Sequence, residues 1–182
     1  VMQTDPNFAN YLYQPDNQRI ALLDFGATHK ISPPLVQIYH RLMLAGLSGD
    51  NVALEETIKG IGFIDENTKD SQRKQIVHMV KLVFDTLQNN RYLDFADTKL
   101  ATHLQDSAMA LAKDGFLPPP LPIDVLLLQR KFGGMFLLAA KLAARVDVVS
   151  LLADHLKGTA LHNKTNRSCH TNENSHRISG VT

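Results

Sequence analysis

Hydrophobic residues recur along most of the chain at intervals of three or four positions, the spacing of one face of an α-helix. The clearest stripe of this kind consists of Ile76, Met79, Val80, Val83, Phe84 and Leu87. Ser32, followed by two prolines, predicts the start of an earlier helix with the Ser32 hydroxyl as its cap. Asp50 predicts the capped start of a second helix that ends near Gly62, and Gly115 predicts the end of a fourth. A long helix is expected from Ile123 to about residue 145, and a shorter one to about residue 156.

The pattern differs in residues 11–23, where two β-prone runs flank the turn-rich stretch QPDNQR. This pattern predicts a β-hairpin, and no other run predicts a convincing strand. The prolines of LPPPLP at residues 117–122 exclude a helix there and predict an extended connector. Gly133 and Gly134 weaken the long helix unless another segment packs closely against it. The expected fold is therefore mainly α with one β-hairpin.

The chain is expected to form one folded unit over residues 1–157. Residues 158–182 are rich in Asn, Thr and Ser, have no hydrophobic periodicity, and predict a disordered tail.

Composition narrows the function classes. Hydrophobic residues make up 44% of the 182 residues, enough for a buried core. Nineteen basic residues stand against eighteen acidic ones, so the clustered basic face of a nucleic-acid-binding protein is not expected. Cys169 is the sole cysteine, which excludes an internal disulfide framework. No apolar run reaches the ~18 residues expected of a membrane-spanning helix.

Three polar residues near the start carry the candidate chemistry. Asp5 and Asn10 are separated as in the D-x-x-x-x-N step of a kinase catalytic loop, and Asp24 begins an Asp-Phe-Gly turn after the predicted hairpin. Carboxylate and amide oxygens suit Mg²⁺, and a carboxylate can also orient an attacking group or accept its proton. The hairpin would return the chain so that Asp24 faces Asp5 and Asn10. This arrangement predicts half of a site for phosphoryl transfer from ATP.

The stretch QTDPNFANYLY…IALLDFGATHKI resembles the UbiB family of atypical kinase-like ATPases, in particular its mitochondrial coenzyme Q branch. Three later stretches share the resemblance, which covers about residues 2–157: YLDFADT at 92–98, GFLPPPLP at 115–122 and LQRKFGGMFLLAAKLAAR at 128–145.

The resemblance implies the C-terminal lobe of a protein-kinase-like α+β fold, with the N-terminal lobe absent and the site segments at residues 3–26. Asp5 then matches the catalytic aspartate, Asn10 and Asp24 match the metal ligands, and Asp24-Phe25-Gly26 matches the turn that contacts the cofactor. The implied cofactors are ATP or ADP and Mg²⁺. The implied role is that of an ATPase or small-molecule kinase supporting ubiquinone biosynthesis, at the matrix side of the inner mitochondrial membrane. Its implied partners are the nucleotide, the coenzyme Q biosynthesis complex and an inner-membrane lipid or prenyl-lipid intermediate.

Two departures from protein kinases disfavour protein phosphorylation. The predicted helix after Ser32 follows Gly26 too closely to leave a peptide-binding segment, and Asn7 stands where such kinases usually have a lysine. The sequence also contains no Gly-rich phosphate loop, so we expect the chain alone to bind ATP weakly or not at all and to hydrolyse none. Arg130 and Lys131 are expected on a solvated helix face, and the resemblance favours a structural or membrane-proximal role for them over catalysis. His29 is expected to be incidental.

Two alternatives stay open. The chain could be a non-catalytic truncated lobe that serves as an interaction module or is an inert fragment. It could instead be a phosphotransferase of the choline or aminoglycoside type, although that reading does not account for the proline connector.

Overall fold

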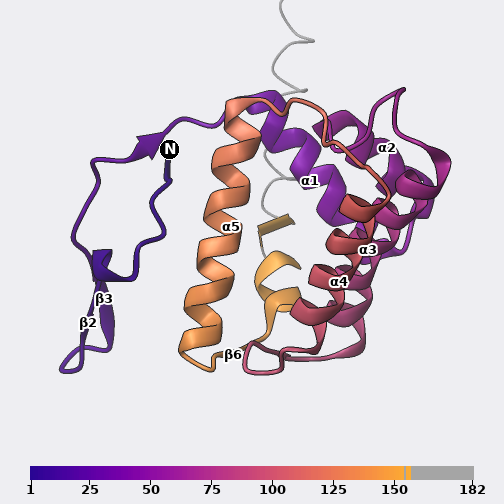
Figure 1. Cartoon of the computed structure of the whole chain (residues 1–182). Helices are drawn as coiled ribbons and strands as arrows, with labels where there is room; N and C mark the ends of the chain where they lie inside the picture. The colour runs from indigo at the N-terminus through magenta and orange to yellow at the C-terminus, as the bar shows by residue number, and fades with distance from the viewer. Residues whose placement is uncertain (154, 157–182) are drawn as a thin grey trace, which may run out of the picture.

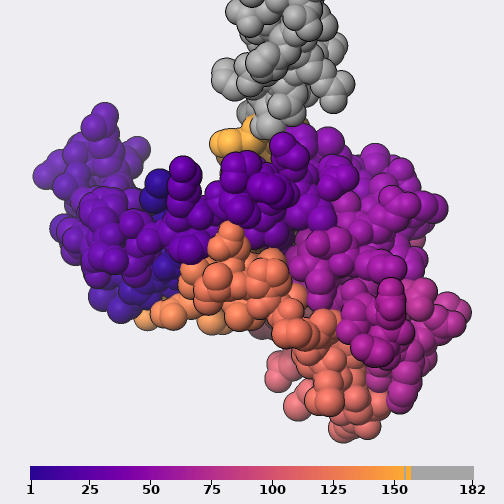
Figure 2. Space-filling model, turned by 90° about the horizontal axis from the view of Figure 1, so that it is seen from above, coloured from indigo at the N-terminus to yellow at the C-terminus, as the bar shows by residue number. Residues whose placement is uncertain are grey.

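The computed structural model describes residues 1–153 together with 155 and 156. Four helices form a bundle on one side of the molecule: α1 (Pro33–Ser48), α2 (Asn51–Ile61), α3 (Asp70–Asn89) and α4 (Lys99–Lys113). A fifth helix, α5 (Ile123–Lys141), stands between this bundle and the opening segment of the chain (Figure 1). Figure 2 shows the opening segment as a projection beside the helical body, with α5 next to it.

The hydrophobic core lies mainly where α1, α2 and α3 meet. Ile58 of α2 is completely buried, and Phe84 of α3 is 5% exposed. Ile76 and Leu87 belong to the same core, so the apolar stripe predicted for the third helix is confirmed. Val125 of α5 is buried too, at 1% exposure, but much of the rest of α5 is exposed.

The helix ends agree with most of the capping residues read from the sequence. Asp50 accepts a hydrogen bond from the backbone N–H of Ala53 at 3.0 Å, as predicted. Gly62 ends α2 with φ of 100°, and Gly115 follows α4 with φ of 74°. The predicted Ser32 hydroxyl cap is wrong, because that side chain makes no capping hydrogen bond in α1. Residues 117–122 are non-helical, as expected of consecutive prolines.

The expectation of a single β-hairpin is too simple. The predicted hairpin is present as β2 (Tyr11–Gln14) paired antiparallel with β3 (Arg19–Leu22). Two further antiparallel pairs occur among the described residues: β1 (Met2–Gln3) with β4 (Thr28–His29), and β5 (Leu93–Asp94) with β6 (Arg145–Val146). Each of these four strands has only two residues, so none could show an alternating pattern in the sequence.

The pairing of β5 with β6 also shortens the long helix. α5 ends at Lys141 instead of near residue 145, and Ala143 adopts a left-handed φ of 48° that turns the chain toward β5. A short helical segment follows over residues 148–153, as expected. No helix among the described residues is both long and apolar enough to cross a membrane. The predicted disordered tail, residues 158–182, lies outside the described residues.

Candidate functional site

The two segments that carry the candidate site lie side by side. At one end, Thr4 donates its backbone N–H and its hydroxyl to the carbonyl of Ala27, at 2.7 and 2.9 Å. At the other end, the backbone N–H of Leu23 donates to the carbonyl of Asn10 at 3.0 Å. The β1–β4 and β2–β3 pairs continue outward from these two points. Residues 5–10 and 23–27 therefore form two facing sides of one closed backbone loop.

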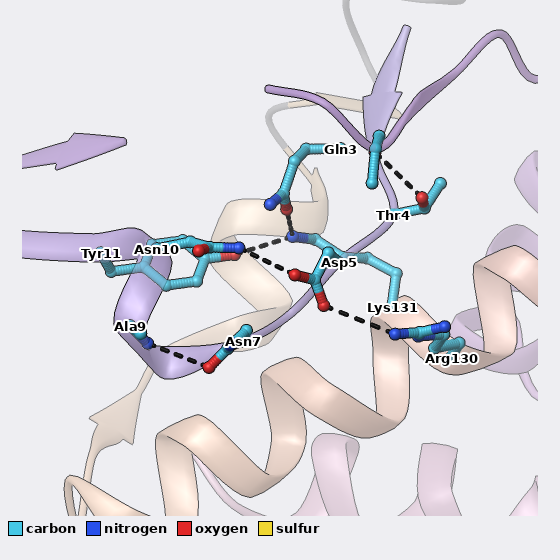
Figure 3. A network of polar contacts seen from close by, with 10 residues as sticks. Gln3, Thr4, Asp5, Asn7, Ala9, Asn10, Tyr11, Arg130 and Lys131 are labelled. Carbon is cyan, nitrogen blue, oxygen red and sulfur yellow. Dashed lines mark hydrogen bonds and ion pairs between the residues drawn. The ribbon is translucent and has the colours of Figure 1, made fainter. Parts of the chain in front are cut away.

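Within the first segment, a short turn returns the chain so that Asn10 reaches Asp5. Asn7 caps the 3-10 helix η1 (Phe8–Asn10) by accepting a hydrogen bond from the N–H of Ala9 at 3.1 Å. The Asn10 side chain then donates its amide N–H to Asp5 Oδ2 at 2.9 Å (Figure 3). This contact between the two residues fixes the direction of the Asn10 side chain, because its amide nitrogen is the atom engaged by Asp5.

The second segment presents the Asp-Phe-Gly turn at the surface. Asp24 Oδ1 accepts a hydrogen bond from the backbone N–H of Gly26 at 2.7 Å, which closes a tight turn around Phe25. A Cβ atom at Gly26 would lie 3.1 Å from that same Asp24 oxygen, so glycine lets the turn close. Asp24 and Gly26 are exposed, and Phe25 is 61% exposed. The turn is thus open to a ligand from solvent.

The oxygen atoms available in these segments fit a hard cation. Among the described residues, no hydrogen bond is found to Asn10 Oδ1 or to Asp24 Oδ2, so both atoms are free to act as ligands. Oxygen-only ligands of this kind suit Mg²⁺, which keeps several of its waters and needs few protein ligands. In the part of the chain that the structure describes, no group of three or more His, Cys, Asp or Glu residues is placed to hold a metal. A site here would therefore depend on Asn10 as well as on aspartates.

Helix α5 supports the first segment through side chains that were not predicted as site residues from the sequence. Arg130 forms an ion pair with Asp5, Nη2 to Oδ1, at 3.5 Å, although the Arg130 side chain is 65% exposed. Lys131 donates to Gln3 Oε1 at 2.9 Å and to the Tyr11 hydroxyl at 2.8 Å (Figure 3). Lys131 is partly buried, so the expectation of a solvated helix face is wrong for this residue.

His29 also contacts α5, at a place that the sequence did not indicate. Its Nε2 lies 2.7 Å from Asp124 Oδ1, in the first turn of α5, so the ring carries its proton on Nε2. Asp124 Oδ2 also accepts the backbone N–H of Ser32 at 3.2 Å, at the residue that precedes α1. The hydrogen bond from His29, assisted by that from Ser32, holds the pKa of the Asp124 carboxyl below its usual range. Asp124 thus joins the end of β4 and the start of α1 to α5.

Comparison with known proteins agrees with the motifs. Residues 1–58 match the family described as the ABC1 atypical kinase-like domain. The chain is 28% identical over 155 residues to the mitochondrial atypical kinase COQ8 of Saccharomyces cerevisiae, covering 84% of the chain and 30% of that protein. It is 30% identical over 150 residues to the mitochondrial atypical kinase coq-8 of Caenorhabditis elegans, covering 80% of the chain and 20% of that protein. It is 28% identical over 153 residues to the mitochondrial atypical kinase COQ8B of Rattus norvegicus, covering 84% of the chain and 29% of that protein.

The chain therefore spans between 20% and 30% of the length of these relatives, while most of the chain itself is matched. The mainly helical structure with small sheets is compatible with a kinase-like domain. These matches confirm the resemblance to the UbiB family: residues 1–58 match the ABC1 atypical kinase-like domain, and most of the chain is similar to atypical kinases named COQ8.

Proposed function

We propose that this chain is the Mg²⁺- and phosphate-binding half of an atypical kinase-like ATPase or small-molecule kinase that supports coenzyme Q biosynthesis. It would correspond to the C-terminal lobe of the kinase-like fold. The observation that carries this proposal is the hydrogen bond from Asn10 to Asp5 on a loop that faces the Asp-Phe-Gly turn. This is the combination of residues that phosphoryl transfer requires in kinase-type sites.

Each residue has a distinct role in the proposal. Asp5 orients the attacking group and accepts its proton, and Arg130 lies beside it as an ion-pair partner. Asn10 and Asp24 would hold the cation through their free side-chain oxygens, and the Asp24-Phe25-Gly26 turn would border the nucleotide. Bound Mg²⁺ would supply the positive charge that offsets the negative charge of the transferring phosphoryl group.

The short connection after the Asp-Phe-Gly turn supports a substrate other than a protein. Only residues 27–32 separate Gly26 from α1, and Thr28–His29 of this stretch are already paired as β4. Protein kinases use a longer segment at this point to hold a peptide. The proposal therefore favours ATP hydrolysis or phosphorylation of a small molecule over protein phosphorylation.

The names of the relatives extend the proposal to location and partners. Several are called mitochondrial atypical kinases. We place this chain by analogy at the matrix side of the inner mitochondrial membrane. Its proposed partners there are the coenzyme Q biosynthesis complex and a lipid or prenyl-lipid intermediate.

The proposal is tested by titrating the purified chain with Mn²⁺, which replaces Mg²⁺ at oxygen sites and is followed by electron paramagnetic resonance. The titration is run with and without ATP. We expect one saturable site, weakened by at least about tenfold in Asp24→Asn and in Asn10→Ala, because even outer partners of a metal are worth ~10–100-fold in affinity. Asp16→Asn, an exposed aspartate in the turn of the same hairpin, is the matched control and should bind as the wild type does. Absence of a saturable site, or equal binding by Asp24→Asn, contradicts the proposal.

A further inference from the structure

One side of α5 holds the loop that carries Asp5 and Asn10. Besides the contacts of Arg130 and Lys131, Met135 accepts a hydrogen bond from the Tyr11 hydroxyl, O to S, at 3.7 Å. Lys141 lies 4.7 Å above the centre of the Phe8 ring. The loop therefore meets α5 along several turns of the helix.

Lys131 contacts both ends of this loop. Gln3 precedes Asp5 by two residues, and Tyr11 directly follows Asn10. The Lys131 ammonium donates to both residues and also lies 5.6 Å from the centre of the Tyr11 ring. One cation thus fixes the separation between the start and the end of the loop, at a place where the side chain is partly shielded from water.

Gly134 lets the middle of the loop approach the helix. A Cβ atom at Gly134 would overlap Cβ and Cγ of Pro6, the residue after Asp5. The neighbouring Gly133 is different, because a Cβ atom there would meet nothing within 4 Å. The two glycines have the same helix propensity, so propensity does not distinguish them. The close approach of Pro6 gives only Gly134 a structural reason to lack a side chain.

We propose that Lys131 and Gly134 are positioning residues for the metal and phosphate site: Lys131 fixes the two ends of the Asp5–Asn10 loop, and Gly134 admits Pro6 between them. This inference rests on the proposed function, because it assigns the loop a cation to bind. When a methyl group is added where a loop packs against a helix, the loop moves because it is more flexible than the helix. Here the loop residue is Pro6, and its displacement moves Asp5 and, through the Asp5–Asn10 hydrogen bond, Asn10.

The two glycines provide a matched experiment. Gly133→Ala and Gly134→Ala add the same methyl group to adjacent positions of α5, and each variant is titrated with Mn²⁺ as above. We expect Gly133→Ala to bind as the wild type does, and Gly134→Ala to bind about tenfold more weakly, as for other outer partners of metal sites. In a Pro6→Gly background the overlapping atoms are gone, so adding Gly134→Ala should weaken binding no further. Equal affinity of Gly133→Ala and Gly134→Ala overturns the role of Gly134.

Lys131 is tested separately, which keeps the proposal decidable if Gly134→Ala loses its helical circular dichroism. Lys131→Met keeps most of the side-chain length but removes the ammonium, and should weaken Mn²⁺ binding about tenfold while the helical signal stays unchanged. Lys131→Arg retains a donor for Gln3 and Tyr11 and should recover most of the affinity. Wild-type affinity in Lys131→Met overturns its positioning role. If the wild type itself shows no saturable site, the proposed function fails instead, so the two failures are distinguishable.

Discussion

Replacement of Gly46 by alanine should destabilise the bundle, although alanine is the better helix former. Gly46 lies in the last turns of α1, where α3 packs against it. A methyl group there would overlap the ring of Phe84, which is 5% exposed in the core. Gln88, one turn later in α3, donates to the carbonyl of Gly46 at 3.0 Å and to that of Leu47 at 2.8 Å. These contacts hold the two helices together and leave the ring little room to move.

The expected magnitude is the difference between two effects. Exchange of glycine for alanine in a helix interior stabilises by about 1 kcal/mol. Overpacking of a core costs about 1–3 kcal/mol. Gly46→Ala should therefore lower the free energy of unfolding by up to about 2 kcal/mol. For a chain of this size, each kcal/mol of lost stability lowers Tm by about 2–4 °C. Gly60→Ala is the contrasting variant, because its methyl group meets the end of the flexible Ile38 side chain, which can rotate away. The gain in helix propensity then remains, so Gly60→Ala should stabilise by up to about 1 kcal/mol.

Urea unfolding followed by circular dichroism at the helix band measures these differences. In a Phe84→Ala background the ring is absent, so Gly46→Ala should there become stabilising by about 1 kcal/mol. The Phe84→Ala exchange itself costs about 3–5 kcal/mol, so the comparison is made between two variants that both carry it. If Gly46→Ala were equally stabilising with and without the Phe84 ring, the close contact between α1 and α3 would not limit this position.

Three further predictions concern a cap, the core and the Asp124 contact. Asp50→Ala removes the acceptor for the Ala53 N–H and should cost about 1 kcal/mol by urea unfolding, whereas Asp50→Asn should cost much less. Ile58→Ala, at a completely buried position, should cost about 2–5 kcal/mol in the same assay, and a loss below about 1 kcal/mol would contradict the burial. Because the pKa of Asp124 is lowered by its contact with His29, this contact contributes stability above the unfolded pKa of about 3.9 and is lost as the pH falls through the lower folded value. Asp124→Asn should thus lower Tm at pH 7, and its difference from the wild type should vanish in strong acid; a difference independent of pH would contradict it.

The elements that could be predicted from the sequence are those whose signals are local. Asp50, Gly62 and Gly115 mark helix ends through their own backbone and side-chain preferences, and the structure agrees at all three. The predicted Ser32 cap is wrong, since its hydroxyl makes no capping hydrogen bond; the contact observed at this helix start, from the Ser32 N–H to Asp124, spans 92 residues. The two-residue strands could not be predicted for a similar reason. Their pairing depends on contacts between distant segments of the chain, and two residues carry no periodicity.

The candidate site also combines a local contact that could be predicted from the sequence with distant contacts that could not. The spacing of Asp5 and Asn10 is local, so the sequence could indicate their contact, and the structure places them 2.9 Å apart. The contacts of Lys131 with Gln3 and Tyr11 span 128 and 120 residues, and nothing near Lys131 in the sequence indicates its partners. One signal was available nonetheless. Asp124, Arg130, Lys131 and Lys141 are charged positions on one side of a helix that is otherwise mostly apolar, which suggests a polar segment packed along that side.

The loop that carries Asp5 and Asn10 depends on α5 because it has little backbone pairing of its own. The β1–β4 pair joins only two residues of each strand, and the β2–β3 hairpin points away from the bundle (Figure 1). Backbone hydrogen bonds therefore close the loop but do not fix where it lies relative to the helices. That position is left to the side chains of α5 and to the space at Gly134. It follows that a change on this side of α5 should alter the site more than a change of the same size at the hairpin tip, although the tip is much nearer in sequence.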